Sequence, residues 1–333
     1  MRMTVLASGS KGNATVVASE RTRVLVDAGL SCRELLRRMA LANEDPTALD
    51  AILITHEHSD HVSGLSVLAR KLHIPVYFTE PTHRAWVRQM TPHTTMTYAK
   101  WLERVQKEKE ARAELAAESS ATEMNAPSVS ASSLRVGGGA TELDLAAAAE
   151  PEPDETTAIK RDPTFLPAVE YFQPGTSFSI GDLTVAPFTT PHDAADPCGF
   201  VFHSAAESIR MAIATDLGYI PPNVKAALKR IDCLLLESNH DLEMLKDGPY
   251  PWAVKQRVLS RVGHLSNDAT AQFLARDYDG AAAYIVLGHL SEANNAPELA
   301  QLAAEQALSE RGSLIGNRVL LAQQSDPLTP ICL

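Results

Sequence analysis

One short stretch of the chain concentrates side chains that bind metal ions. It reads Thr55-His56-Glu57-His58-Ser59-Asp60-His61 and follows the apolar residues 51–54. His56 and His58 alternate, so an extended backbone points both imidazoles to the same side. Asp60 and His61 begin the next helix and approach from a different direction. Such a loop can hold two ions at once, and its nitrogen and oxygen ligands suit zinc and related divalent metals.

The same stretch resembles a motif of a known family. H-x-H-x-D-H after an apolar strand, with Asp27-Ala28-Gly29 upstream, is similar to the pattern of the metallo-β-lactamase superfamily. The resemblance implies an α/β fold, the αββα sandwich, in which two mixed sheets are flanked by helices and the metals lie at one edge. It also implies a single domain of this fold over residues 1–333.

In that superfamily the remaining ligands come from later loops, and residues of the right type follow here in the same order: His192, Asp216 and His289. The resemblance implies two divalent ions, with Zn²⁺ as the first expectation and Mn²⁺ as the alternative. The implied ligands of one ion are His56, His58 and His192. The implied ligands of the other are Asp60, His61 and His289, with Asp216 bridging the pair. Asp27 is expected to orient a ligand imidazole through its ring N–H.

The implied reaction is metal-assisted hydrolysis. Two ions about 3.5–4 Å apart lower the pKa of a bridging water and provide hydroxide near neutral pH. Asp60 and Asp216 are therefore expected to be catalytic as well as metal-binding. The stretch Gly263-His264-Leu265-Ser266-Asn267 is similar to a segment of the tRNA-maturation phosphodiesterases, in which a histidine contacts the substrate. His264 is accordingly expected to neutralise a phosphate or protonate the leaving oxygen; the alternative is an ordinary helix N-terminus.

Several features narrow the choice within the superfamily. Position 216 holds Asp rather than the Cys of the main lactamase class, and position 58 holds His rather than the Glu of the diiron flavoproteins. Only 72 residues separate Asp216 from His289, too few for an inserted β-CASP domain. The chain resembles instead the compact YycJ/WalJ-like group, which implies 5′→3′ exonuclease action on double-stranded DNA. The segments that carry this resemblance are 6–13, 191–194, 236–239, 263–267, 289–291 and 294–295.

The turn Ser8-Gly9-Ser10-Lys11-Gly12-Asn13 is a further candidate for substrate binding. Its backbone N–H groups, its hydroxyls and the Lys11 ammonium could surround a phosphate, as glycine-rich nests do. The predicted contacts are Ser8, Ser10, Lys11 and Asn13, together with His264. The alternative is an ordinary tight hairpin, which uses the same residue types.

The surrounding sequence predicts the elements that must position these residues. Apolar and alternating runs predict strands over residues 4–7, 14–18, 23–27, 50–55, 75–78, 183–189, 199–203, 210–215, 233–237, 284–287 and 318–322. Amphipathic runs predict helices over residues 31–42, 64–72, 81–89, 223–230, 252–262, 268–276 and 297–309. The strands come in two batches, which predicts two packed sheets with each half of the chain supplying one.

Residues 101–162 separate the two batches and differ from them in composition. They carry thirteen Asp and Glu against seven Lys and Arg, and residues 119–155 are rich in Ala, Ser, Gly and Pro. Such a segment buries too little apolar surface to order itself, so we expect a disordered acidic insertion in a surface loop. The formal net charge of the chain is −11. Because bound ions would add positive charge at the site, this value does not exclude a polyanionic substrate.

The cysteines and the first residues bear on the compartment. The four cysteines are scattered without a C-x-x-C pair, and the first residues lack the apolar stretch of an export signal. No apolar run approaches the roughly 20 residues that a bilayer crossing needs. We therefore expect a cytoplasmic protein with reduced thiols and no membrane partner.

Duplex DNA is the expected partner and substrate, but two other functions stay open. One is a thioesterase or small-ester hydrolase, as in the glyoxalase II type, that uses the same pair of metals. The other is a nucleic-acid-binding protein whose metal site does not turn over. The full set of seven ligands argues against the second alternative, because a binding relic is expected to lose some of them.

Overall fold

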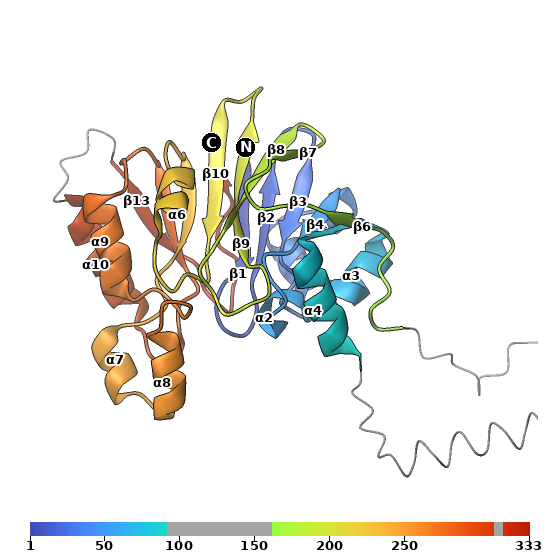
Figure 1. Cartoon of the computed structure of the whole chain (residues 1–333). Coiled ribbons are helices and arrows are strands. Elements are labelled where there is room, and N and C mark those ends of the chain that lie inside the picture. Colours follow the sequence, from blue (N-terminus) through green and yellow to red (C-terminus); the bar gives the residue numbers. More distant parts are fainter. Residues whose placement is uncertain (92–161, 310–315) are drawn as a thin grey trace, which may run out of the picture. The chain divides into compact units, whose positions relative to one another are not determined.

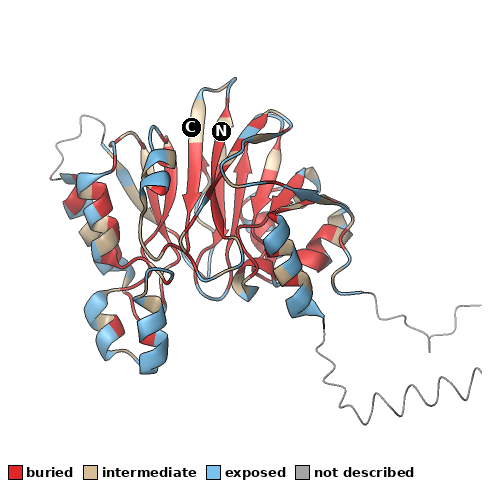
Figure 2. Ribbon diagram, in the orientation of Figure 1, coloured by how far each residue is buried: buried red, intermediate tan, exposed pale blue. Residues whose placement is uncertain are grey.

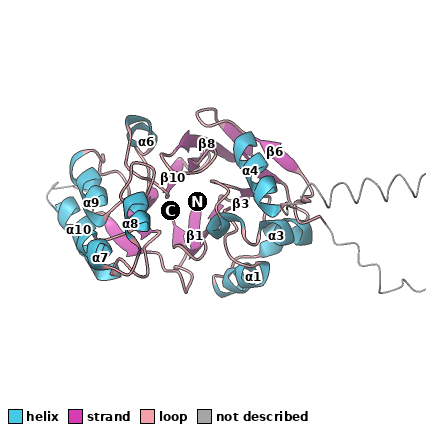
Figure 3. Ribbon diagram, turned by 60° about the horizontal axis from the view of Figure 1, so that its bottom comes forward, coloured by secondary structure: helices cyan, strands magenta, loops and turns pink. Residues whose placement is uncertain are grey.

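Two seven-stranded sheets form the centre of the protein, and helices cover the outer face of each (Figure 1). The computed structural model describes residues 1–91, 162–309 and 316–333. Figure 3 shows the same layers from another side, with the strands between two groups of helices. The predicted αββα sandwich of two mixed sheets flanked by helices is therefore confirmed.

Alternation along the strands explains why four layers form. Val5 and Val17 belong to the core between the two sheets. Leu6 and Val16, one position away on the same strands, belong to a second core beneath the helices. Because successive side chains point to opposite faces, a strand that is apolar on both faces must be covered on both. Figure 2 shows the result, with buried strands and helices exposed on their outer sides.

The first sheet has the order β14-β1-β2-β3-β4-β5-β6. Its strands β1 to β3 are antiparallel neighbours, whereas β3, β4, β5 and β6 run parallel. The strands span β1 Arg2–Ala7, β2 Ala14–Ala18, β3 Arg23–Val26, β4 Ala51–Leu53, β5 Val76–Phe78, β6 Val169–Tyr171 and β14 Ile331–Cys332.

The second sheet has the order β13-β12-β11-β10-β9-β8-β7. Strands β10 to β13 are parallel, so their carboxyl ends meet at one edge, where ligands of α/β proteins usually bind. The strands span β7 Phe178–Ile180, β8 Leu183–Thr189, β9 Cys198–Ser204, β10 Ile209–Ala214, β11 Cys233–Glu237, β12 Tyr284–Gly288 and β13 Arg318–Leu321.

The helices begin at capping residues that the sequence supplies. The hydroxyl of Ser31 accepts a hydrogen bond from the Glu34 amide, and that of Ser266 accepts one from the Ala269 amide. The helices span α1 Cys32–Leu41, α2 Ser59–Val62, α3 Leu65–Leu72, α4 Glu80–Met90, α6 Pro222–Ala227, α7 Leu242–Asp247, α8 Trp252–Val258, α9 Asn267–Arg276 and α10 Pro297–Ser309.

One detail of the predicted topology is wrong. The two halves of the chain do not each supply one sheet, because β6 and β14, which follow residue 162, join the first sheet. Both are short edge strands of three and two residues, too short for a periodic signal. The short strand β7 and the six-residue helix α7 were also not predicted.

The predicted acidic insertion, 101–162, lies outside the described residues except for Asp162. Across residues 1–91, 162–309 and 316–333, no helix has the length and apolar character that a membrane crossing requires. All four cysteines are free thiols.

Candidate metal centre

Four strands lead into the loops that carry the predicted ligands. β4 precedes His56, β8 precedes His192, β10 precedes Asp216 and β12 precedes His289. The structure brings all seven predicted ligands into overlapping groups whose ligand atoms lie within 4.8 Å of one another. Residues up to 233 positions apart in the chain thus converge on one place.

The first group contains His56, His58 and His192. Nε2 of His192 lies 3.3 Å from Nδ1 of His58. Two ligand atoms of a tetrahedral zinc ion, each about 2.0–2.1 Å from the metal, are roughly 3.3 Å apart. The spacing of these imidazoles therefore fits one shared cation.

The second group contains Asp60, His61 and His289. Oδ2 of Asp60 lies 3.5 Å from Nε2 of His61 and 3.6 Å from Nε2 of His289. Asp216 lies between the two groups, with Oδ2 at 3.5 Å from Nε2 of His61 and Oδ1 at 3.8 Å from Nε2 of His192. Its two oxygens thus face ligand nitrogens of both groups.

Hydrogen bonds on the far side of each ring fix which nitrogen carries the proton. Nδ1 of His192 donates to the Gly263 carbonyl at 3.1 Å, and Nδ1 of His61 donates to Oδ2 of Asp27 at 2.8 Å. Nδ1 of His289 donates to Oε1 of Glu237 at 2.7 Å. These acceptors cannot donate, so each neutral ring presents an unprotonated Nε2 to the centre.

The centre therefore collects acceptor atoms that need a cation. Nε2 of His56, Oδ2 of Asp216 and Nε2 of His289 are buried and have no hydrogen-bond partner among the described residues. Leaving a buried polar atom unpaired costs about 1–3 kcal/mol each. Divalent ions bound by nitrogen and oxygen ligands would satisfy these three atoms, so the donor set fits divalent metal.

The carboxylates of the centre are held in the ionised form that binds metal. Burial acts to raise the pKa of Asp60, but the imidazoles of His61 and His289 outweigh it and hold that pKa well below its usual range. Asp216 follows the same pattern, with burial opposed by His289 and His61, and its pKa is also held low. Both carboxylates stay ionised at neutral pH.

Asp27 supports the centre from behind, where it was predicted to orient an imidazole. Besides the ring of His61, its carboxylate accepts hydrogen bonds from the Thr55 amide at 2.9 Å and from the Thr55 hydroxyl at 2.9 and 3.0 Å. The same Thr55 begins the loop that carries the first ligands. Asp27 thus ties one ligand to the backbone of the metal-binding loop.

Glu237, at the end of β11, was missed as a site residue. Oε1 accepts from Nδ1 of His264 at 2.8 Å and from Nδ1 of His289 at 2.7 Å. Oε2 accepts from the amides of Leu217 at 2.7 Å and Leu265 at 3.2 Å. Burial acts to raise the pKa of Glu237, but the two imidazoles lower it to about 2.

The contacts of Glu237 with His264 and His289 are hydrogen bonds and not the contacts of ligands that share a metal ion. The contacts of 2.7 and 2.8 Å between Glu237 and the two rings are hydrogen-bond lengths and shorter than the spacing of ligands around one zinc ion. The available signal was a carboxylate at the exit of an apolar strand, within the segment 236–239 that carries the family resemblance, but nothing in the sequence indicated its role.

His264 lies beside the metal clusters. Its ring centroid is 5.0 Å from those of both His192 and His289. Because Nδ1 donates to Glu237, Nε2 is the ring nitrogen available for the predicted substrate contact, and the side chain is half-buried.

The turn of residues 8–13 packs against the same loops, but its buried groups are largely engaged within the protein. The hydroxyl of Ser8 accepts from the His289 amide at 2.8 Å. Nδ2 of Asn13 lies 3.1 Å from Nε2 of His61 and 3.3 Å from Oδ2 of Asp60. Ser8 and Asn13 are buried, so they position ligands, and their contact with substrate stays a prediction.

The exposed part of this turn consists of Ser10 and Lys11. The backbone amide of Lys11 donates to the side chain of Gln324 at 2.8 Å, and its ammonium pairs with Glu292 at 2.5 Å. The amides of Gly9 and Gly12 are also bonded within the turn. An open nest of amides is therefore not formed, and among the predicted contacts in this turn Ser10 and Lys11 are the exposed side chains.

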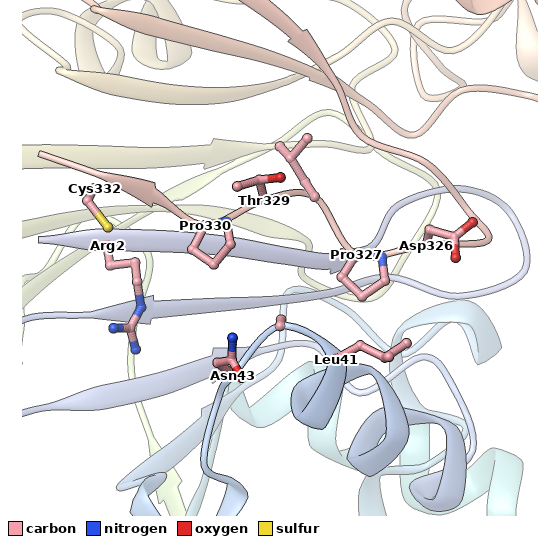
Figure 4. Close-up of a pocket in the computed structure, with 10 residues that line it drawn as sticks. Arg2, Leu41, Asn43, Asp326, Pro327, Thr329, Pro330 and Cys332 are labelled. Atoms are coloured by element: carbon pink, nitrogen blue, oxygen red, sulfur yellow. The ribbon is translucent and has the colours of Figure 1, made fainter.

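A cavity of about 600 Å³ lies elsewhere, beside the start of β1 and the end of α1 (Figure 4). Arg2, Asn43 and Asp326 are among the residues that line it. None of the seven predicted ligands lines this cavity. This cavity is therefore not part of the candidate metal centre.

Comparison with known proteins agrees with this geometry. The family model described as the metallo-beta-lactamase superfamily matches residues 7–254. The chain is 32% identical over 330 residues to exodeoxyribonuclease YycJ of Bacillus anthracis, covering 99% of this chain and 97% of that protein. It is 30% identical over 315 residues to exodeoxyribonuclease WalJ of Streptococcus pneumoniae, covering 95% and 91%.

Solved structures share the fold at low sequence identity. The metallo-beta-lactamase fold protein YhfI of Bacillus subtilis aligns with a TM-score of 0.58 at 14% identity and 98% coverage of both chains. The short form of human tRNase Z aligns with a TM-score of 0.53 at 16% identity, covering 99% of this chain and 100% of that one.

The chain belongs to the metallo-β-lactamase superfamily and is a metal-dependent hydrolase. Within the superfamily it is similar over nearly its whole length to the YycJ and WalJ proteins, so the resemblance to that group is confirmed.

Proposed function

We propose that the protein is a phosphodiesterase, namely a 5′→3′ exonuclease that acts on double-stranded DNA with two divalent ions. Relatives named exodeoxyribonuclease support the substrate class. The observation that carries the metal part is the convergence of acceptor atoms on both sides of the Asp216 carboxylate. His56, His58 and His192 would hold one ion, and Asp60, His61 and His289 would hold the other.

When bound, the ions supply Lewis acidity and a hydroxide near neutral pH. Asp216 holds both groups of ligands in register, and ionised Asp60 accepts a hydrogen bond from the attacking nucleophile. His264 donates the Nε2 proton to the departing oxygen. Because the anionic Glu237 accepts from Nδ1, it stabilises the protonated ring and keeps Nε2 pointed at the substrate.

Zinc is the proposed metal, because three imidazoles meet at the first group. Manganese remains the alternative for the group with two carboxylates, since oxygen-rich sites accept it. Metal analysis of the purified protein and activity after reconstitution with each ion separate the two.

The decisive assay offers metal-loaded protein a 5′-phosphorylated duplex DNA, the same duplex with a 5′-hydroxyl, a linear RNA and a thioester. We expect nucleotides to be released from duplex DNA, progressively from the 5′ end, and His58→Ala to abolish release. Cleavage of the thioester alone would identify a small-ester hydrolase. Duplex binding without cleavage would identify a binding protein, and cleavage that survives His58→Ala would refute the assigned site.

A further inference from the structure

The helical pair α7 and α8 lies at the same end of the molecule as α2, which follows the first metal-binding residues (Figure 1). The segment after α8 is bonded directly to the loop of the third metal-binding histidine. The Val262 carbonyl accepts from the Asp193 amide at 3.1 Å, and the Gly263 carbonyl accepts from the His192 ring at 3.1 Å. The end of α8 therefore forms one rim of the metal centre.

Arg257 on α8 brings a positive charge to this rim. Its guanidinium contacts both oxygens of Asp193, through Nη2 at 3.0 Å and through Nε. Oδ1 of Asp193 lies 3.4 Å from Nε2 of His192, so the ion pair adjoins the first group of ligands. The carboxylates of Asp193 and Asp60 raise the pKa of Arg257, so its guanidinium stays charged.

Asp193 holds Arg257 in place but engages only part of its hydrogen-bonding capacity. Its side chain is 58% exposed, and within the described part of the chain only two of the five guanidinium N–H groups that an arginine carries are engaged. An exposed ion pair of this kind adds little to stability. The tether therefore orients the guanidinium while three donors remain for a second anion.

The same rim carries surface suited to a nucleic acid. The guanidinium of Arg261 lies over the ring of Tyr219 at 4.2 Å. Trp252 and Leu259, at the two ends of α8, are 66% and 51% exposed. Exposed arginines beside a metal centre and exposed apolar groups meet the needs of a phosphate backbone and of sugars and bases.

We propose that Arg257 binds a backbone phosphate of the DNA next to the one being cleaved, with Asp193 as its tether. This inference rests on the proposed nuclease function. A guanidinium binds phosphate in a bidentate manner, which a lysine cannot reproduce. In a chain of net charge −11, such a contact brings a polyanion to the metal centre.

The test compares Arg257→Ala and Arg257→Lys with Arg276→Ala, which removes the same charge from an exposed position at the end of α9. For Arg257→Ala we expect KM for duplex DNA to rise about 10-fold with a smaller change in kcat. For binding to a phosphorothioate duplex, the slope of the logarithm of the binding constant against the logarithm of the salt concentration should become shallower by about one. Arg257→Lys should restore the salt dependence but only part of KM.

Asp193→Asn separates phosphate binding from a bracing role. If Arg257 only braced the His192 loop, Arg257→Ala would show the same KM increase as Asp193→Asn and keep the wild-type salt dependence, and that outcome overturns the inference. If Arg257 binds phosphate, Asp193→Asn keeps the wild-type salt dependence. Equal KM and salt dependence in Arg257→Ala and Arg276→Ala also overturn it.

The two proposals fail in different ways. A wild-type protein that binds the duplex but does not cleave it refutes the nuclease function, while the salt dependence of Arg257→Ala still decides the role of Arg257. A wild-type protein that binds no duplex refutes both.

Discussion

Replacing Glu237 by glutamine tests the hydrogen-bond network behind the metal centre. The carboxylate accepts four hydrogen bonds, two from imidazoles and two from backbone amides. A glutamine of the same shape has one acceptor oxygen and one NH₂ group. At least two donors must then face the NH₂ group, in a position that is fully buried.

The expected cost follows from two independent routes. A hydrogen bond to a charged group contributes about 1.5–3 kcal/mol, so losing two costs about 3 kcal/mol or more. The pKa of Glu237, lowered to about 2 from an ordinary 4.5, corresponds to a similar stabilisation of about 3 kcal/mol. This stabilisation is fully present above pH 4.5 and is lost as pH falls towards 2.

Metal affinity should fall as well. To accept a hydrogen bond from the glutamine, His289 must move its proton from Nδ1 to Nε2, the atom that faces Asp60. A protonated Nε2 cannot bind a cation, and loss of such a supporting contact lowers metal affinity about 10–100-fold.

The measurements are urea unfolding of the metal-free protein and competition for zinc against a chelator of known affinity. Glu170→Gln, on an exposed edge strand, is the matched control. Wild-type values of both quantities in Glu237→Gln would refute the network described above.

Three further predictions address the loop contacts, the pH dependence and the metal. A Cβ at Gly29 would lie 1.6 Å from the Asp60 carbonyl oxygen, so Gly29→Ala should lower the free energy of unfolding by about 2 kcal/mol or more and reduce metal content; a variant that melts and binds metal like wild type contradicts this close approach. Burial lowers the pKa of His240 to about 4, so the unfolded chain takes up this proton first and the metal-free protein should lose stability as pH falls from about 6.5 to 4. His240→Gln should reduce that loss in urea titrations at pH 7 and 4.5, and an unchanged loss would exclude His240 as its source. Chelation should lower Tm, since it leaves the acceptor atoms of the centre unpaired, and an unaltered Tm after verified metal removal would show that no resident ion stabilises the fold.

The sequence predicted the strongly periodic parts of the fold and much less at its margins. Strands such as β2, β8 and β11 have the predicted bounds because long apolar runs leave little choice of register. The edge strands β6 and β14 were missed, since two or three half-exposed residues carry no period. Their assignment depends on neighbours that are distant in sequence.

The candidate site shows the same division. The predicted ligands could be identified from one motif and from residues at the ends of strands, and the structure brings these residues together. The task of Glu237 was not readable, because it arises from contacts with His264 and His289, 27 and 52 positions away. The engagement of Lys11 with Gln324, 313 positions away, was hidden for the same reason.

Backbone conformation explains why these strand exits can carry a metal centre. Asp27, Asp216 and His289 have left-handed backbones, with φ of 61°, 59° and 55°. Each follows a strand by one or two residues, where the chain must turn so that its side chain faces the centre. This conformation costs a non-glycine residue roughly 1–2 kcal/mol.

Neighbouring hydrogen bonds hold these strained residues in place. The Asp27 amide donates to the Leu53 carbonyl at 2.8 Å, and the His289 amide donates to the Ser8 hydroxyl at 2.8 Å. Glycine would relieve the strain, but it would remove the carboxylate or imidazole that the turn exists to present. The strain and the functional side chain are therefore inseparable at these positions, and the rigid ends of β3, β10 and β12 set the geometry of the candidate metal centre.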